Sequence, residues 1–115
     1  MTCFWDALRN KLNITIDNTT FVEHLKNNNT KANILWNGDK LSTKQIEENY
    51  EHITIFNQNS IFNGYDCSTC DPFLILICNL YNVNINHNYN GYTMEYLKNS
   101  DFKILHFRSN TGHFW

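Results

Sequence analysis

Two residues at opposite ends of this 115-residue chain have the side-chain chemistry of a cysteine hydrolase. Such an enzyme needs a thiolate, and a base that activates the thiol and later protonates the leaving group. Cys3 could supply the thiolate and His113 the base, because the two groups need only meet in the fold. Each residue also has a plainer interpretation, Cys3 as a small buried apolar residue and His113 as an ordinary strand residue.

The residues around Cys3 predict that a helix positions it. Phe4, Leu8 and Leu12 recur at helical spacing, so we expect a helix over 3–12 with Thr2 as its N-cap. A thiol in the first turn lies at the positive end of the helix dipole, which favours the thiolate.

The rest of the chain predicts an α+β fold in which N-terminal helices pack on a small C-terminal antiparallel sheet. Ser42 and Gln45 form a capping-box pattern at the start of one helix, and Pro72 is suited to the first position of another, with Asp71 as its cap. Further helices are expected over 19–26, 43–53 and 72–81, and strands over 32–36, 83–86, 102–108 and, after a tight turn, 113–115. The stretch 54–68 is expected to be irregular, and 91–98 to be a loop or one helical turn. We expect one domain, 1–115, because no linker or repeat divides the chain.

Two short motifs resemble those of a known protease group. Thr2-Cys3-Phe4-Trp5-Asp6-Ala7-Leu8 is similar to the nucleophile motif of viral papain-like proteases and of the ovarian-tumour (OTU) family. Thr111-Gly112-His113-Phe114-Trp115 is similar to their Gly-His-aromatic motif. The layout between the motifs also resembles the group, whose compact members include torovirus and other nidovirus papain-like proteases and the picornavirus leader protease.

The resemblance implies a compact papain-like fold and a viral cysteine endopeptidase. Cys3 would be the nucleophile and a source of an oxyanion N–H, His113 the base, Trp5 an aromatic beside the nucleophile, and Gly112 the small residue before the histidine. Members of the group process viral polyproteins, and several remove ubiquitin or ubiquitin-like modifiers. The implied partner is therefore a polypeptide of one of these kinds, and no cofactor is expected. The many Asn residues, 20 in all, fit a coding sequence from an A/T-rich genome, which many viruses have.

The chain departs from the family pattern after His113. Trp115 stands where many OTU members carry an Asn or Asp that orients the imidazole. Three interpretations stay open: a Cys-His dyad, a third group from elsewhere in the fold, or a fragment of a longer protein. Asp66 and Asp101 are unassigned candidates for the third group. The alternative function is a catalytically inactive papain-like fold that acts as a host-protein interaction module.

Cys67 and Cys70 form a C-x-x-C pair before the apolar helix. The pair could be half of a zinc site or a redox couple, but no second C-x-x-C exists and Cys78 lies within the apolar helix. We expect plain loop and cap residues, and no metal.

Composition excludes several classes of partner. A net charge of −2 and a pI of about 6.2 provide no basic surface for nucleic acid. No apolar run approaches the length of a membrane span, and the first residues lack the features of a signal peptide. We therefore expect a cytoplasmic protein, in the host cytosol if the protein is viral.

Overall fold

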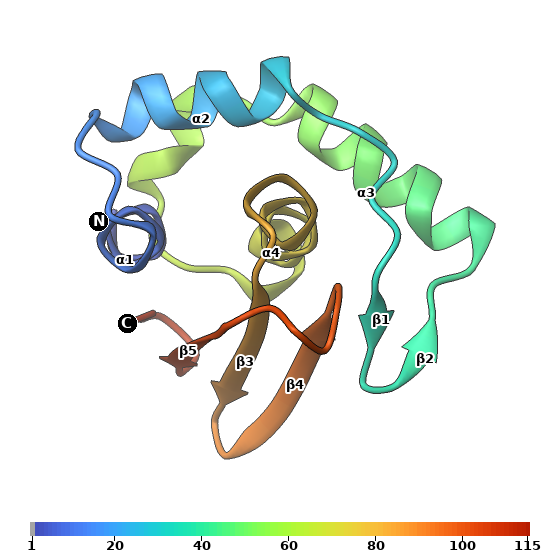
Figure 1. Ribbon diagram of the computed structural model, residues 1–115. Coiled ribbons are helices and arrows are strands. Elements are labelled where there is room, and N and C mark those ends of the chain that lie inside the picture. Colours follow the sequence, from blue (N-terminus) through green and yellow to red (C-terminus); the bar gives the residue numbers. More distant parts are fainter. Residues whose placement is uncertain (1) are drawn as a thin grey trace.

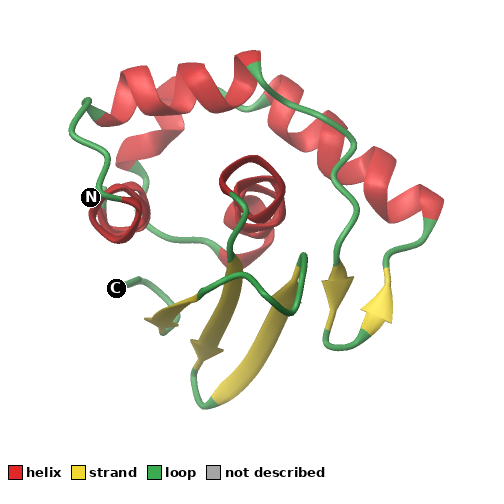
Figure 2. Cartoon of the chain, viewed as in Figure 1, coloured by secondary structure: helices red, strands yellow, loops and turns green. Residues whose placement is uncertain are grey.

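A single apolar helix, α4 (Cys67–Tyr81), lies in the middle of the molecule. In the computed structural model, which describes residues 2–115, three helices arch over one side of α4 and a sheet closes the other (Figures 1 and 2). The arch consists of α1 (Cys3–Leu12), α2 (Asn18–Asn27) and α3 (Thr43–Ile55). A short 3₁₀ helix, η1 (Gln58–Phe62), connects α3 to α4. The buried apolar residues form one cluster around α4.

The sheet has five strands in the order β2-β1-β4-β3-β5. The strands are β1 (Leu35–Trp36), β2 (Asp39–Lys40), β3 (Asn84–Tyr89), β4 (Tyr92–Leu97) and β5 (Ile104–Ser109). Strand β3 pairs antiparallel with β4 but parallel with β5. The α+β class is thus confirmed, but the prediction of a purely antiparallel sheet is wrong, because the connection after β4 returns the chain to the far side of β3.

The three N-terminal helices form where the sequence predicts them. The capping box of α3 is complete, with Ser42 N–H donating to Gln45 Oε1 at 2.8 Å and Gln45 N–H donating to Ser42 Oγ at 3.1 Å. Only Ile53 of its expected apolar face is buried, whereas Tyr50 is 36% exposed. The strand expected over 32–36 is reduced to its last two residues.

Helix α4 begins five residues before the predicted start. Asp66, not Asp71, occupies the cap position, and Cys70 N–H donates to Asp66 C=O at 2.9 Å. Pro72 is the sixth residue of the helix, beyond the first turn, so its missing N–H removes one hydrogen bond of the helix. The prediction that Cys67 and Cys70 lie in a loop is therefore wrong, because both belong to the first turn of α4.

The segment 91–98, expected to be a loop or a helical turn, contains strand β4. Asn90 and Gly91 connect β3 to β4 with φ angles of +49° and +86°. Two successive positive φ angles are typical of the tight hairpin turn that Asn-Gly favours. The dipeptide is the sequence signal that would have predicted this hairpin.

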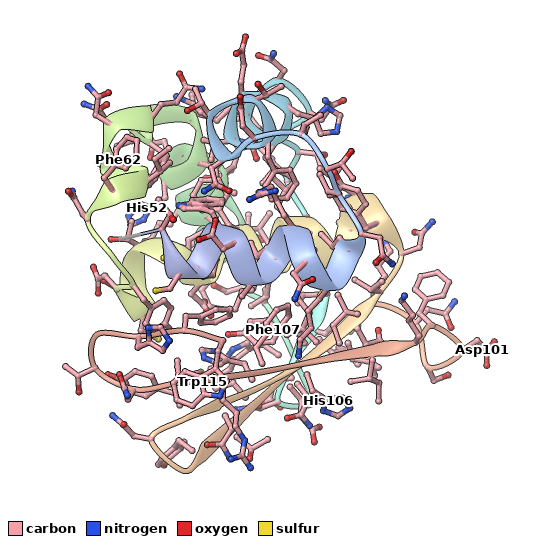
Figure 3. All side chains as sticks on the ribbon, turned by 90° about the vertical axis from the view of Figure 1, so that its left-hand side faces the viewer. His52, Phe62, Asp101, His106, Phe107 and Trp115 are labelled. Carbon is pink, nitrogen blue, oxygen red and sulfur yellow. The ribbon has the colours of Figure 1, made fainter. Side chains whose placement is uncertain are left out.

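The C-terminal residues fold back along β5, as predicted. Arg108 and Trp115 exchange two backbone hydrogen bonds of 2.8 Å, and Phe114 bridges to Ser109. Burial alternates along β5, and Figure 3 shows Phe107 between α1 and the sheet with His106 on the other side of the strand. No helix within residues 2–115 combines the length and the apolar character needed to cross a bilayer.

Gly91 should be sensitive to the addition of a side chain because of its backbone alone. Nothing lies within 4 Å of the place a Cβ would occupy, so Gly91→Ala meets no clash but strains the positive φ. We expect a loss of about 1 kcal/mol in unfolding free energy, measured by urea denaturation. Gly112→Ala is the matched control, because Gly112 is equally unobstructed and has no positive φ. Equal stabilities of the two variants would contradict this account.

Candidate active site

Cys3 is the first residue of α1 and its side chain is half-buried. The first N–H groups of a helix have no carbonyl to bond within the helix, so the thiol lies beside unpaired donors and the positive end of the dipole. Thr2 precedes the helix but does not cap it, because its Oγ1 donates to Asp6 Oδ2 at 2.7 Å. Cys3 is thus a partly accessible thiol at the start of a helix.

His113 lies in the segment that folds back along β5. Its backbone is held by Asn110, whose N–H donates to His113 C=O at 3.0 Å and whose Oδ1 accepts from His113 N–H at 2.9 Å. The imidazole is exposed and stacks on Trp115 with ring centroids 5.3 Å apart. Among residues 2–115, neither ring nitrogen of His113 has a hydrogen-bond partner, so stacking on Trp115 is the interaction that holds the ring.

The fold brings the two motifs together through the residues that follow Cys3 and His113. Phe4 and Phe114 make an edge-to-face contact with ring centroids 4.8 Å apart, and each is 1% exposed. Cys3 lines an open depression of about 460 Å³ together with Phe114 and Trp115. Figure 3 shows Trp115 beside α1 at this place. His113 itself is not among the residues that line this depression, so the structure brings the two motifs together without placing the His113 imidazole beside Cys3.

Cys3 and His113 do not, however, form a hydrogen bond, and no described carboxylate bonds to the His113 imidazole. Asp66 accepts from Thr69 Oγ1 at 2.8 Å at the start of α4. Asp101 is exposed in the connection from β4 to β5, where its N–H donates to Asn99 Oδ1. Neither candidate for a third group contacts the histidine.

Sequence reasoning missed the other residues that line the depression with Cys3. They lie along α1 at helical spacing from Cys3, which is the signal that would have found them: Asp6, Ala7, Asn10 and Lys11. Although partial burial opposes it, hydrogen bonds from Asn18, Thr2 and Arg9 hold the pKa of Asp6 below its usual value. Lys11 Nζ donates to His106 C=O. The charged groups of Asp6 and Lys11 therefore already form hydrogen bonds with other groups of the protein.

Trp5 and Gly112 lie outside this depression. Trp5 is 3% exposed and packs edge-to-face on Phe73, so its role is in the core. It also lines a small cavity together with Cys70, and not the depression at Cys3. Gly112 is exposed in the turn, with open space around it.

The other three thiols differ in accessibility. Cys70 and Cys78 are buried, and burial raises the pKa of each to about 12. Cys67 is half-buried at the start of α4. No three His, Cys, Asp or Glu side chains within the described chain are grouped as a metal site would require. Cys67 is thus the one described thiol, besides Cys3, that is partly accessible.

A buried histidine was also missed. His87, expected in an Asn-rich loop, is 0% exposed on β3, and its Nε2 lies 2.6 Å from Ser109 Oγ. Its Nδ1 is buried without a hydrogen-bond partner. Burial lowers the pKa of His87 to about 4, so the ring is neutral at physiological pH.

Comparisons of this chain with protein-family models, with curated proteins and with solved structures found no match. Its function must therefore be inferred from its own residues.

His87 should make the protein less stable in mild acid. The unfolded chain binds a proton near the ordinary pKa of 6.5, whereas the folded chain does so only near 4, so stability present above pH 6.5 is lost as the pH falls toward 4. Between pH 7.5 and 5.0 we expect a loss of about 2 kcal/mol, measured by urea unfolding.

His87→Gln should abolish most of this pH dependence, while the exposed His24→Gln should retain it. A pH dependence that survives in His87→Gln would assign the effect to another group.

Proposed function

We propose that this chain is a cysteine hydrolase of peptide or isopeptide bonds, with Cys3 as nucleophile and His113 as base. The observation that carries the proposal is the contact between the two motifs, in which Phe4 packs on Phe114 and so places the start of α1 beside the C-terminal segment. The finer assignment, a papain-like protease of viral type with polyprotein or ubiquitin-like substrates, rests on the resemblance of the two motifs.

In the proposed reaction, the imidazole of His113 takes the thiol proton of Cys3 and the sulfur attacks the carbonyl carbon. The N–H of Cys3, at the start of α1, would stabilise the oxyanion. His113 then gives its proton to the leaving amine as the C–N bond breaks. Water hydrolyses the thioester that remains, and this step restores the thiol.

The missing Cys3–His113 hydrogen bond is compatible with this reaction, since catalytic hydrogen bonds are often long before substrate binds. The backbone of His113 is anchored by Asn110 while its imidazole is held only by stacking on Trp115. Completing the dyad requires the imidazole to leave Trp115 and turn toward Cys3.

A second candidate is an inactive module that binds a host protein. The specific observation in its favour is that no hydrogen bond links Cys3 to His113 and that, within residues 2–115, no polar group bonds to the imidazole. The two candidates differ in the reactivity of Cys3. Cys67 is the comparison thiol, because it is also half-buried at the first residue of a helix, so only activation by His113 should make Cys3 react faster.

The experiment for the first candidate uses ubiquitin with an electrophilic C-terminal group. We expect a one-to-one adduct that mass spectrometry maps to Cys3. Cys3→Ala should abolish it and His113→Ala should slow it by about 100-fold or more, the usual contribution of a general base. Cys67→Ala is the matched control and should leave the rate unchanged.

An adduct on Cys67, or one that survives Cys3→Ala, would contradict the assignment. If ubiquitin does not react, the alkylation rates of Cys3 and Cys67 with iodoacetamide separate the candidates. A faster Cys3 that slows in His113→Ala indicates an enzyme with another substrate. Equal rates favour the inactive module. A panel of peptides with bulky or Gly-Gly ends then tests the preference for small residues that the resemblance implies.

A further inference from the structure

A second cleft lies where α3, the start of α4 and strands β1 and β4 come together. It encloses about 350 Å³, within the range of small-ligand sites, and an adjoining cavity of about 250 Å³ shares four of its lining residues. The shared residues are Trp36, Glu48, Asn49 and Asp71. No residue of the cleft lines the depression at Cys3. It is therefore a separate candidate site.

Asp71 lines both the cleft and the adjoining cavity. Its Oδ1 accepts a hydrogen bond from the hydroxyl of Tyr96, which is 1% exposed and fixes the carboxylate in place. Its Oδ2 has no hydrogen-bond partner among residues 2–115, and no described cation pairs with it. Burial raises the pKa of Asp71, which means that ionising this carboxylate without a partner costs free energy. A cation in the cleft would supply the missing partner.

The walls of the cleft favour positive charge. Glu48 adds a second carboxylate, neither cavity is lined by a Lys or Arg, and the one basic side chain in the lining is His52 of α3. Lys44 lies 3.8 Å from Glu48, but both side chains are more than half exposed, so this ion pair is weak and leaves Glu48 available. The start of α4 contributes only about half a positive charge, less than the two carboxylates.

Trp36 provides an aromatic wall. Aromatic rings attract ammonium and guanidinium groups that lie over their faces. The indole Nε1 is buried near the Tyr96 hydroxyl without a hydrogen bond of ordinary geometry, so its NMR signal would report a change in this cleft.

We propose that this cleft binds a cationic side chain, the guanidinium of an arginine or the ammonium of a lysine on a polypeptide partner. Asp71 is the principal counter-ion, Glu48 the second, and Trp36 the aromatic wall. The apolar part of the cleft, Pro72 and Met94, suits the methylene stem that carries such a charge. The proposal does not depend on the protease assignment.

The test is an NMR titration of the full chain at pH 7.5, with the Trp36 indole N–H as reporter. The probes are Nα-acetyl-arginine amide, Nα-acetyl-lysine amide and the neutral isostere Nα-acetyl-citrulline amide. Single side chains bind weakly, so we expect a Kd of about 1 mM for either cation. Citrulline should bind at least about tenfold more weakly, since it lacks the charge.

Asp71→Asn should weaken binding of both cations by about tenfold, and Glu48→Gln by less. In Asp71→Asn the amide oxygen can still accept the hydrogen bond from Tyr96. Glu48→Gln changes an exposed residue, so it tests the proposal even if Asp71→Asn fails to fold. Glu51→Gln is the matched control, because Glu51 lies on α3 but lines neither cavity. Equal binding of citrulline, or full affinity in both Asp71→Asn and Glu48→Gln, would overturn the proposal.

Discussion

The structure depends first on the burial of α4. Eight of its residues, from Cys70 to Cys78, are buried, and its apolar side chains point in every direction, so the helix needs cover on all sides. The arch of helices covers one side and the sheet the other (Figure 1). Each large apolar side chain that is fully buried contributes roughly 1.5–3 kcal/mol. The ion pairs between described residues join mostly exposed side chains and contribute about 0–1 kcal/mol each, so they do not decide the fold.

The same core sets the position of the candidate active site. Phe4 packs on Trp5 and on Phe114, and Trp5 packs on Phe73 of α4. These ring contacts join the start of α1, the central helix and the C-terminal segment. Cys3 precedes Phe4 and His113 precedes Phe114, so each candidate residue is next to one of these rings in the sequence. The proposed dyad therefore rests on an apolar support, whereas the imidazole itself is held by its stacking on Trp115. A damaged core would displace both groups at once.

Two polar side chains, Asn84 and Asp71, differ in how completely they are hydrogen-bonded within the protein. Asn84 is fully paired: its amide donates to the carbonyls of Asn99 and Phe102, and its Oδ1 accepts from the N–H groups of Lys98 and Asn99. It therefore fixes the connection from β4 to β5. Asp71 is different, because one of its oxygens is bonded by Tyr96 and the other faces a cleft. A paired group of the first kind is explained by folding alone, whereas Asp71 is the residue on which we base the proposed cation site.

The sequence by itself determined the elements whose signals are local. Helix α1, the capping box of α3 and the hairpin at the C-terminus follow from periodicity, side-chain caps and turn residues, which act over a few positions. Local signals also pointed to Cys3 and His113. The Asn90-Gly91 turn was present in the sequence and was overlooked, and Pro72 misplaced the start of α4 because a proline is tolerated slightly inside a helix. Only the tertiary structure decided that β3 pairs parallel with β5 and that His87 is buried. It also decided that Trp5 lies in the core and that a cleft forms at Asp71. These four features depend on contacts between segments far apart in the chain, which no local pattern encodes.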